Sequence, residues 1–183
     1  MFPFTETFFK ILHCALAFLK KIFLNRSLDL SQVLDLDWDY QIRSIQPAIA
    51  YDFLVGWTKE PAISSDLIRQ VKGAIKEDFL QESQSAVKNL EKGLREGNQK
   101  EIETSIKRAD KNLKSLNTLI YTPALKELQE ATEGLSACAK SSGAGGGDCG
   151  IALSFDPVET QTLIDRWKEK NIEVIYQERM GDS

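Results

Sequence analysis

Apolar residues return every three or four positions over two long segments, which is the spacing of one helix face. The first segment runs from about Leu67 to Glu96, and the second runs from about Lys100 to Leu119. Gly97-Asn98 separates them and predicts a tight turn. We therefore expect an antiparallel pair of helices whose charged positions form solvated faces.

Other segments have the character of strands. Tyr51–Thr58 is apolar and rich in aromatic and β-branched residues, which predicts a buried strand. Gly56 inside it predicts a close backbone approach or a bulge. Weaker strand patterns cover residues 41–46, which end at Pro47, and residues 137–139, 151–155 and 172–176.

Two further helices have recognisable first turns. Thr122 is placed to cap a helix with Pro123 at its first position, running to about Thr132. Asp156-Pro157 starts another helix, which ends near Asn171. The polar tail, residues 177–183, is expected to fray. The order of elements predicts an α+β fold, a mostly antiparallel sheet with packed helices that include a long helical hairpin.

Residues 1–24 are the most apolar part of the chain, yet they read as neither a membrane span nor a signal peptide. The longest uninterrupted apolar run, Cys14 to Leu19, is far shorter than the ~20 residues that a span needs. Glu6, Lys10 and His13 also interrupt the stretch. We favour a core helix, with an interfacial amphipathic helix as the alternative. Residues 1–30 are accordingly predicted to be a segment distinct from a domain over residues 31–183.

Composition narrows the function classes. The net charge of −4 and the pI of about 5.2 argue against broad binding to nucleic acid. Three cysteines without a CxxC pair favour a reducing compartment, and we expect a cytoplasmic protein. With His13 as the single histidine, a His-based zinc site or a Ser-His-Asp triad has almost nothing to be built from, and no metal site is predicted.

The most informative stretch is Lys140–Gly150, which holds five glycines between two of the strand patterns. Glycine has no Cβ, so such a loop can bring backbone N–H groups close to an anion. The loop matches neither the GxxxxGK[ST] nor the GxGxxG pattern. A flexible linker between domains is the alternative interpretation.

The stretch Lys140–Leu153 resembles the third, C-terminal motif of the GHMP small-molecule kinases, and most closely that of their bacterial phosphomevalonate kinase subfamily. Phe53–Thr58 with the following Pro61-Ala62 and Ser64-Ser65, and Tyr121–Leu125, resemble two further stretches of that subfamily. Asp148 stands where mevalonate kinases usually carry more glycine. The resemblance spans roughly residues 30–178 and implies a ferredoxin-like GHMP kinase C-terminal domain.

The resemblance also implies a reaction, the transfer of the γ-phosphate of ATP to 5-phosphomevalonate with Mg²⁺ bridging phosphates. The backbone N–H groups around Ser142 and Gly143 would neutralise phosphate charge, and the hydroxyls of Ser141 and Ser142 would donate to phosphate oxygens. Lys140 is either a diffuse cation or a solvent-facing lysine at a strand end, and Asp148 would orient the loop or touch substrate. The implied phosphate-binding set is Lys140, Ser141, Ser142, Gly143, Ala144, Gly145, Gly146, Gly147 and Asp148.

Other residues near these motifs receive structural roles. Cys138 and Cys149 are predicted to be small buried hydrophobes, and Trp57 is predicted to be a core residue rather than a stacking platform. Lys59 and Ile63 replace small residues of the subfamily, which leaves their substrate contacts open.

No Gly-x-Gly-Ser-Ser-Ala run precedes the resembling region, and the catalytic Asp and Lys of the family belong to its N-terminal half. We therefore expect no catalytic residue in this chain, no activity of the chain alone, and a partner role for that other half. The alternatives are a non-catalytic α+β domain that binds a phosphorylated ligand or a partner protein, and a GHMP kinase acting on mevalonate or homoserine.

Overall fold

The structure is a computed structural model that describes residues 44–61, 71, 73–143 and 145–181. Nearly all of these residues belong to one compact unit, Gln46–Ser183. The predictions for residues 1–30, the start of the first long helix near Leu67 and the position of Ala144 fall outside the described residues.

The sheet has the order β2-β3-β1-β4 and every pairing in it is antiparallel. Its strands are β1 (Tyr51–Trp57), β2 (Ala137–Ser141), β3 (Cys149–Ser154) and β4 (Glu173–Met180). The central pair is β1 and β3, so residues far apart in the sequence form the middle of the sheet. This order, with helices between β1 and β2 and between β3 and β4, is the predicted ferredoxin-like α+β topology.

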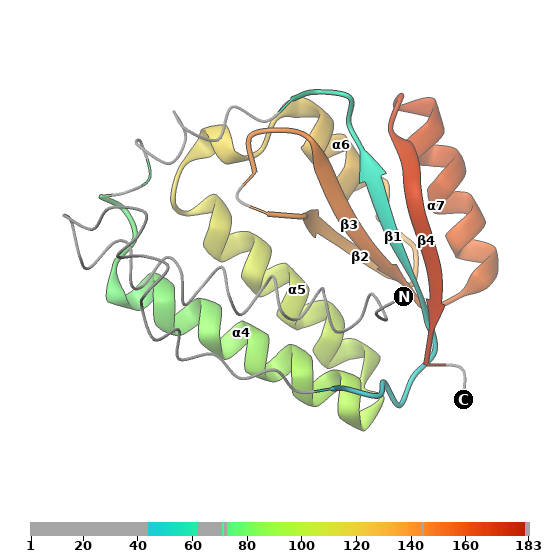
Figure 1. Cartoon of the computed structure of the whole chain (residues 1–183), viewed down its shortest axis with the longest axis horizontal. Coiled ribbons are helices and arrows are strands. Elements are labelled where there is room, and N and C mark those ends of the chain that lie inside the picture. Colours follow the sequence, from blue (N-terminus) through green and yellow to red (C-terminus); the bar gives the residue numbers. More distant parts are fainter. Residues whose placement is uncertain (1–43, 62–70, 72, 144, 182–183) are drawn as a thin grey trace, which may run out of the picture. The chain divides into compact units, whose positions relative to one another are not determined.

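Helices lie on both faces of this sheet. They are α4 (Glu77–Glu96), α5 (Gln99–Lys114), α6 (Pro123–Glu130) and α7 (Pro157–Glu169), with a 3₁₀ turn η1 (Thr118–Ile120). Figure 1 shows α4 and α5 running side by side as the predicted hairpin, with α5 next to β2. Ala137 and Ala139 face α6 and α7, so the alternate residues Cys138 and Lys140 point to the other face, toward α5.

The predicted first long helix is interrupted, because Val71 is helical but the chain then leaves the helix before α4. The chain turns at Gly73-Ala74, Lys76 is extended, and α4 begins only at Glu77. Gly73 has no neighbour that a side chain would touch, so packing does not offset the low helix propensity of glycine there. The predicted turn at Gly97 is confirmed, with a left-handed φ of 67°.

The second helix also ends early, at Lys114 rather than near Leu119. The Asn117 side chain accepts a hydrogen bond from the backbone N–H of Leu119 at 2.8 Å and starts η1. The predicted cap at Thr122 is confirmed, because its side chain accepts from the Leu125 N–H in the first turn of α6. The predicted helix start at Asp156-Pro157 is also confirmed, and the Asp156 side chain caps α7 by accepting from the N–H groups of Val158 and Glu159.

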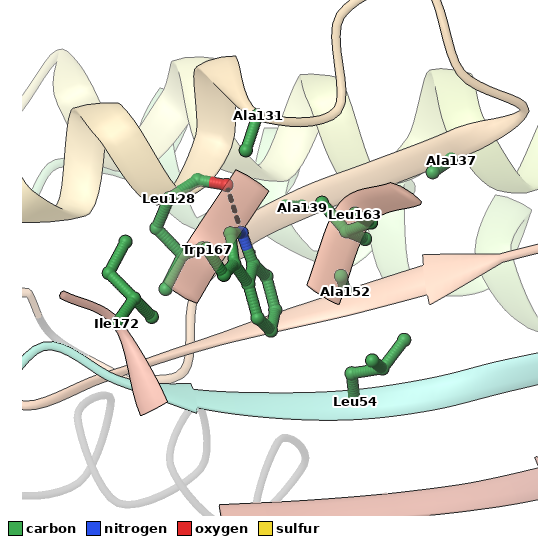
Figure 2. Packing of buried hydrophobic residues seen from close by; sticks show 9 residues of the cluster. All are labelled: Leu54, Leu128, Ala131, Ala137, Ala139, Ala152, Leu163, Trp167 and Ile172. Carbon is green, nitrogen blue, oxygen red and sulfur yellow. Dashed lines mark hydrogen bonds between the residues drawn. The ribbon is translucent and has the colours of Figure 1, made fainter. Parts of the chain in front are cut away.

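Trp167 occupies the centre of the core between the sheet and the helices (Figure 2). It is fully buried, and its Nε1–H donates to the backbone carbonyl of Leu128 in α6 at 2.8 Å. Both predictions for Gly56 are confirmed. A Cβ there would lie 2.8 Å from the Trp167 ring, and the β1–β4 register shifts between Val55 and Gly56. The other cluster members are Leu54, Ala131, Ala137, Ala139, Ala152, Leu163 and Ile172.

Several sequence predictions are wrong. Trp57 is not a core residue but is 37% exposed, because it is the last residue of β1. Cys149 is only half-buried, whereas Cys138 is buried as predicted. Residues 44–46 form no strand.

The tail prediction is wrong as well, because β4 continues to Met180 instead of fraying after Tyr176. Arg179 donates to the Asp52 carboxylate at 3.1 Å, and Thr160 of α7 donates to the same oxygen at 2.7 Å. The buried Asp52 thus joins β1, β4 and α7, and pairing with β1 holds the end of the chain in the sheet.

Candidate functional site: the glycine-rich loop between β2 and β3

The glycine-rich stretch is a loop at the end of the β2–β3 hairpin. Strand β2 extends through Lys140 and Ser141, so both residues belong to the sheet and both are buried. The Ser142 N–H donates to the Cys149 carbonyl at 3.0 Å and closes the base of the loop. The loop proper therefore covers residues 142–148.

The second half of the loop has a left-handed backbone. Gly145, Gly146, Gly147 and Asp148 have φ values of 82°, 85°, 124° and 68°. Such a run is disfavoured for residues with a Cβ, so three consecutive glycines satisfy a backbone requirement. This conformation is specific, which argues against the flexible-linker interpretation.

Backbone hydrogen bonds hold that half against two other segments. The N–H of Gly146 donates to the Ile120 carbonyl at 2.8 Å, and the N–H of Asp148 donates to the Glu60 carbonyl at 2.5 Å. Thr58 donates two hydrogen bonds to the Asp148 carbonyl, one from its N–H and one from its hydroxyl, each 2.8 Å long. The loop is thus held on one side by the end of η1 and on the other by the segment after β1.

Two glycines are also required by close packing. A Cβ at Gly145 would overlap the carbonyl oxygen of Ile120, and a Cβ at Gly147 would lie 2.8 Å from the carbonyl oxygen of Glu60. At Gly143 there is open space and no positive φ.

The first half of the loop faces solvent. Gly143 and Asp148 are exposed and Ser142 is half-buried. The Ser141 hydroxyl is buried and donates to the Gly143 carbonyl at 3.1 Å, so it shapes the turn. The N–H groups of Ser142, Gly146 and Asp148 already donate to backbone carbonyls. The expected phosphate contact of the Ser142 N–H is therefore not available in this conformation, and an anion would meet the loop first at the exposed Gly143.

A cluster of charged and polar side chains lies beside the start of the loop. The ammonium of Lys140 donates to the backbone carbonyl of Ser141, and the Ser141 N–H donates to the Tyr121 hydroxyl oxygen at 3.2 Å. The Tyr121 hydroxyl donates to one oxygen of Asp110 on α5, and Lys114 pairs with the other at 2.8 Å. All but Lys114 are buried.

Burial dominates the proton affinities in this cluster. It lowers the pKa of Lys140 to about 8, and the neighbouring Asp110 carboxylate opposes that shift. Burial, together with the hydrogen bond to Asp110, raises the pKa of Tyr121 well above its ordinary value. Tyr121 is therefore a neutral hydroxyl that donates to Asp110 and accepts from Ser141.

The structure places Lys140, Ser141, Ser142, Gly143, Gly145, Gly146, Gly147 and Asp148 in one hairpin, and their contact with phosphate stays a prediction. Sequence reasoning missed Asp110, because charged residues of this helix were assigned to the solvated face although Asp110 lies on the buried face of α5. The loop contacts of the Ile120 and Glu60 carbonyls could not be predicted either, because every residue has a backbone carbonyl and the sequence does not show which of them a loop will bond. The polar break that Asp110 makes among the apolar stripe of α5 was the one available signal.

Neither a metal cluster nor a membrane helix is evident in the described part of the chain. No group of three or more His, Cys, Asp or Glu side chains in residues 44–61, 71, 73–143 and 145–181 is arranged to hold a metal ion. None of the helices in those ranges is both long enough and apolar enough to span a bilayer.

Part of this chain, including the loop, matches a known protein family. Residues 86–173, which include α5, the glycine-rich loop and α7, match the family described as GHMP kinases C terminal. The chain carries a GHMP kinase C-terminal domain. The glycine-rich loop is part of the matched region of this GHMP kinase domain, whereas β1 and most of β4 lie outside it.

The relatives of this GHMP kinase domain include phosphomevalonate kinases. The Streptococcus pneumoniae phosphomevalonate kinase structure is 48% identical with a TM-score of 0.76, over 85% of this chain and 48% of that one. A structure of the same enzyme in complex with phosphomevalonate and AMPPNP has the same identity and TM-score. The Streptomyces sp. (strain CL190) phosphomevalonate kinase is 31% identical over 141 residues, which is 71% of this chain and 38% of that protein.

Leishmania major mevalonate kinase, at 15% identity and a TM-score of 0.64, shares the fold alone. The chain spans 48% of the S. pneumoniae structure and 38% of the Streptomyces protein, so it corresponds to about half of these relatives or less.

Proposed function

We propose that this domain contributes the C-terminal, phosphate-facing part of a phosphomevalonate kinase, which transfers the γ-phosphate of ATP to 5-phosphomevalonate. The observation that carries the proposal is the glycine-rich loop, held in one left-handed conformation by backbone bonds to Ile120 and Glu60. The 48% identity to an enzyme studied with phosphomevalonate and AMPPNP supports the choice of substrate.

In the proposed reaction, this domain needs only to help position the phosphates and to neutralise their charge. Phosphoryl transfer proceeds through a loose transition state, and catalysis rests on fixed donors around the phosphate oxygens. In our proposal the exposed Ser142–Gly143 end of the loop faces those oxygens. Asp148 orients the loop through its backbone, since its carbonyl accepts both bonds from Thr58.

In the proposal, this domain contacts the phosphates of ATP through its loop but does not bind Mg²⁺ through its own side chains. The glycine loop fits a phosphate chain, because it presents small residues at an exposed turn. The described residues hold no cluster of three or more His, Cys, Asp or Glu arranged for a metal ion, so a Mg²⁺ ion would be bound with the nucleotide and would neutralise phosphate charge. The nucleotide loop and the catalytic Asp and Lys would come from a domain like the remaining half of the relatives, and the site of action would be the cytoplasm.

Ligand binding by the ¹⁵N-labelled chain tests this proposal. We expect 5-phosphomevalonate and the non-hydrolysable analogue AMPPNP with Mg²⁺ to shift the amide signals of Ser142 and Gly143. Mevalonate and homoserine serve as competitors and should shift them less. The Ser142→Ala variant should weaken binding by a few-fold, and Ser115→Ala, which removes an exposed hydroxyl at the end of α5, is the matched control.

The possible outcomes separate the candidate functions. Tighter binding of mevalonate or homoserine would reassign the domain within the GHMP kinases. Phosphate binding without any preference for phosphomevalonate would favour the non-catalytic phosphate-binding domain. No loop shift with any phosphorylated ligand would overturn the proposal.

A further inference from the structure

Ser141, the residue at which the glycine loop leaves the sheet, is held by side chains at both of its backbone polar groups. Its N–H donates to the Tyr121 hydroxyl at 3.2 Å, and its carbonyl accepts from the Lys140 ammonium. Backbone groups near a hairpin end usually pair with the neighbouring strand or with water. Here two buried side chains from outside the loop determine where the loop begins.

Asp110 orients the tyrosine. One carboxylate oxygen accepts from the Tyr121 hydroxyl, and the other pairs with Lys114 at 2.8 Å. The Lys114 ammonium also lies 4.4 Å from the centre of the Tyr121 ring. Because the Tyr121 hydroxyl donates its hydrogen to Asp110, its oxygen is left to accept, and it accepts from the Ser141 N–H.

Tyr121 directly follows Ile120, and these consecutive residues contact both ends of the loop. Ile120 accepts from Gly146, in the second half of the loop, at 2.8 Å. Tyr121 holds Ser141, which precedes the first half. The segment after α5 therefore sets the span between the two ends of the loop.

We propose that Asp110 and Tyr121 are positioning residues of the phosphate-facing loop, which act by holding Ser141 so that the loop is ordered before ligand binds. This inference rests on the proposed function. Ordering a loop in advance removes part of the entropy cost of binding. A buried charged cluster rarely adds stability over apolar packing, so its presence at this point is better explained by ordering than by stability.

The net positive charge of this cluster also favours an anion at the neighbouring loop. Lys114 and the protonated Lys140 carry one positive charge more than Asp110 balances. Lys140 is only 7% exposed, and a charge in such surroundings acts at longer range than a solvated one.

The first test is amide hydrogen exchange in the ¹⁵N-labelled chain carrying Tyr121→Phe. We expect the amides of Ser141 and Ser142, which donate to Tyr121 and Cys149, to exchange at least tenfold faster, while Ala152 and Ser154 in the β3–β1 ladder keep their rates. Tyr176→Phe removes an exposed hydroxyl that bonds Glu178 and is the matched control. Equal acceleration everywhere, or none at the loop, would overturn the inference, because the tyrosine would then act on the whole fold or not at all.

The second test is affinity for inorganic triphosphate. Tyr121→Phe should weaken binding about tenfold, and Tyr176→Phe should leave it unchanged. If Tyr121→Phe folds poorly, Asp110→Leu removes the acceptor of the Tyr121 hydroxyl and serves in the exchange experiment, where it should likewise speed exchange at Ser141 and Ser142. Unchanged affinity in a folded variant overturns the inference. Failure of the unaltered chain to bind triphosphate counts against the proposed function, whereas the exchange experiment still tests the positioning role.

Discussion

At the scale of single residues, the glycines of the loop are not equivalent. Gly145 and Gly147 sit against carbonyl oxygens of Ile120 and Glu60 with positive φ, whereas Gly143 is exposed in open space. A sequence motif treats these positions alike. The structure separates those that shape the loop from the one that is free to meet a ligand.

Gly145→Ala should destabilise the domain by about 2 kcal/mol or more, because the added Cβ strains a left-handed backbone and overlaps the Ile120 carbonyl. Gly143→Ala is the matched control and should change the free energy of unfolding by less than about 0.5 kcal/mol. Urea denaturation followed by circular dichroism measures both. Equal effects of the two substitutions would contradict the described loop conformation.

Because Lys140 is buried, we expect the free energy of unfolding to depend on pH. Its pKa is lowered to about 8 by burial, while the unfolded chain titrates near the ordinary value of 10.5. Between these two values the unfolded state binds more protons than the folded state, so stability rises with pH in that window. Relative to Lys140→Met, which has no titrating group, the wild type should gain about 2 kcal/mol between pH 7.5 and 9.5.

Denaturant midpoints of the two proteins at pH 7.5, 8.5 and 9.5 measure that difference. Comparing them removes the contributions of all groups that titrate alike in both. A difference that stays constant across the window would mean that Lys140 is not a buried, titrating group.

At the scale of elements, one side chain of α7 contacts both α6 and the sheet. Trp167 lies against Gly56 of β1 and bonds the Leu128 carbonyl of α6 (Figure 2). The absence of a side chain at Gly56 lets the ring approach the strand. The β1–β4 bulge at the same position shows that strand geometry and helix packing are adjusted to each other here.

Trp167→Phe should cost about 2–4 kcal/mol, because it leaves a cavity in the core and removes the partner of a buried carbonyl. Trp57→Phe changes the same residue type at an exposed strand end and should cost less than about 1 kcal/mol. Thermal unfolding of the two variants provides the comparison. A Trp57 variant as unstable as the Trp167 variant would contradict the burial described here.

At the scale of the whole molecule, our proposal gives the domain one side of a phosphate site. The chain covers 48% of the S. pneumoniae phosphomevalonate kinase structure that it resembles, and the glycine loop lies in the region that matches the GHMP kinase family. Its sequence contains no Gly-x-Gly-Ser-Ser-Ala run for the nucleotide phosphates.

We therefore expect the purified 183-residue chain to form no diphosphomevalonate from ATP and 5-phosphomevalonate. Coupled detection of ADP, with a full-length relative as the positive control, measures this. Turnover above the level of a Gly145→Ala preparation would show that the described loop and its neighbours suffice for catalysis.

Most elements could be predicted because their signals are local. Thr122-Pro123 and Asp156-Pro157 start helices through bonds within one turn, and β1 reads as a strand because its residues are buried on both faces. The start of α4 and the length of β4 could not be predicted. Helix propensity near Gly73 is marginal, and β4 is a partly exposed edge strand that depends on pairing with β1 and on the Arg179–Asp52 contact.

The sequence by itself determined that a glycine-rich, anion-compatible loop joins two strands of an α+β domain, since glycine spacing and apolar periodicity are properties of the chain. Only the tertiary structure decided how that loop is held. The carbonyls of Ile120 and Glu60 belong to the backbone, which every residue has, so no side-chain pattern could mark them. Asp110 and Ser141 are joined through Tyr121 only after α5 packs on β2, because contact between distant segments is a consequence of folding.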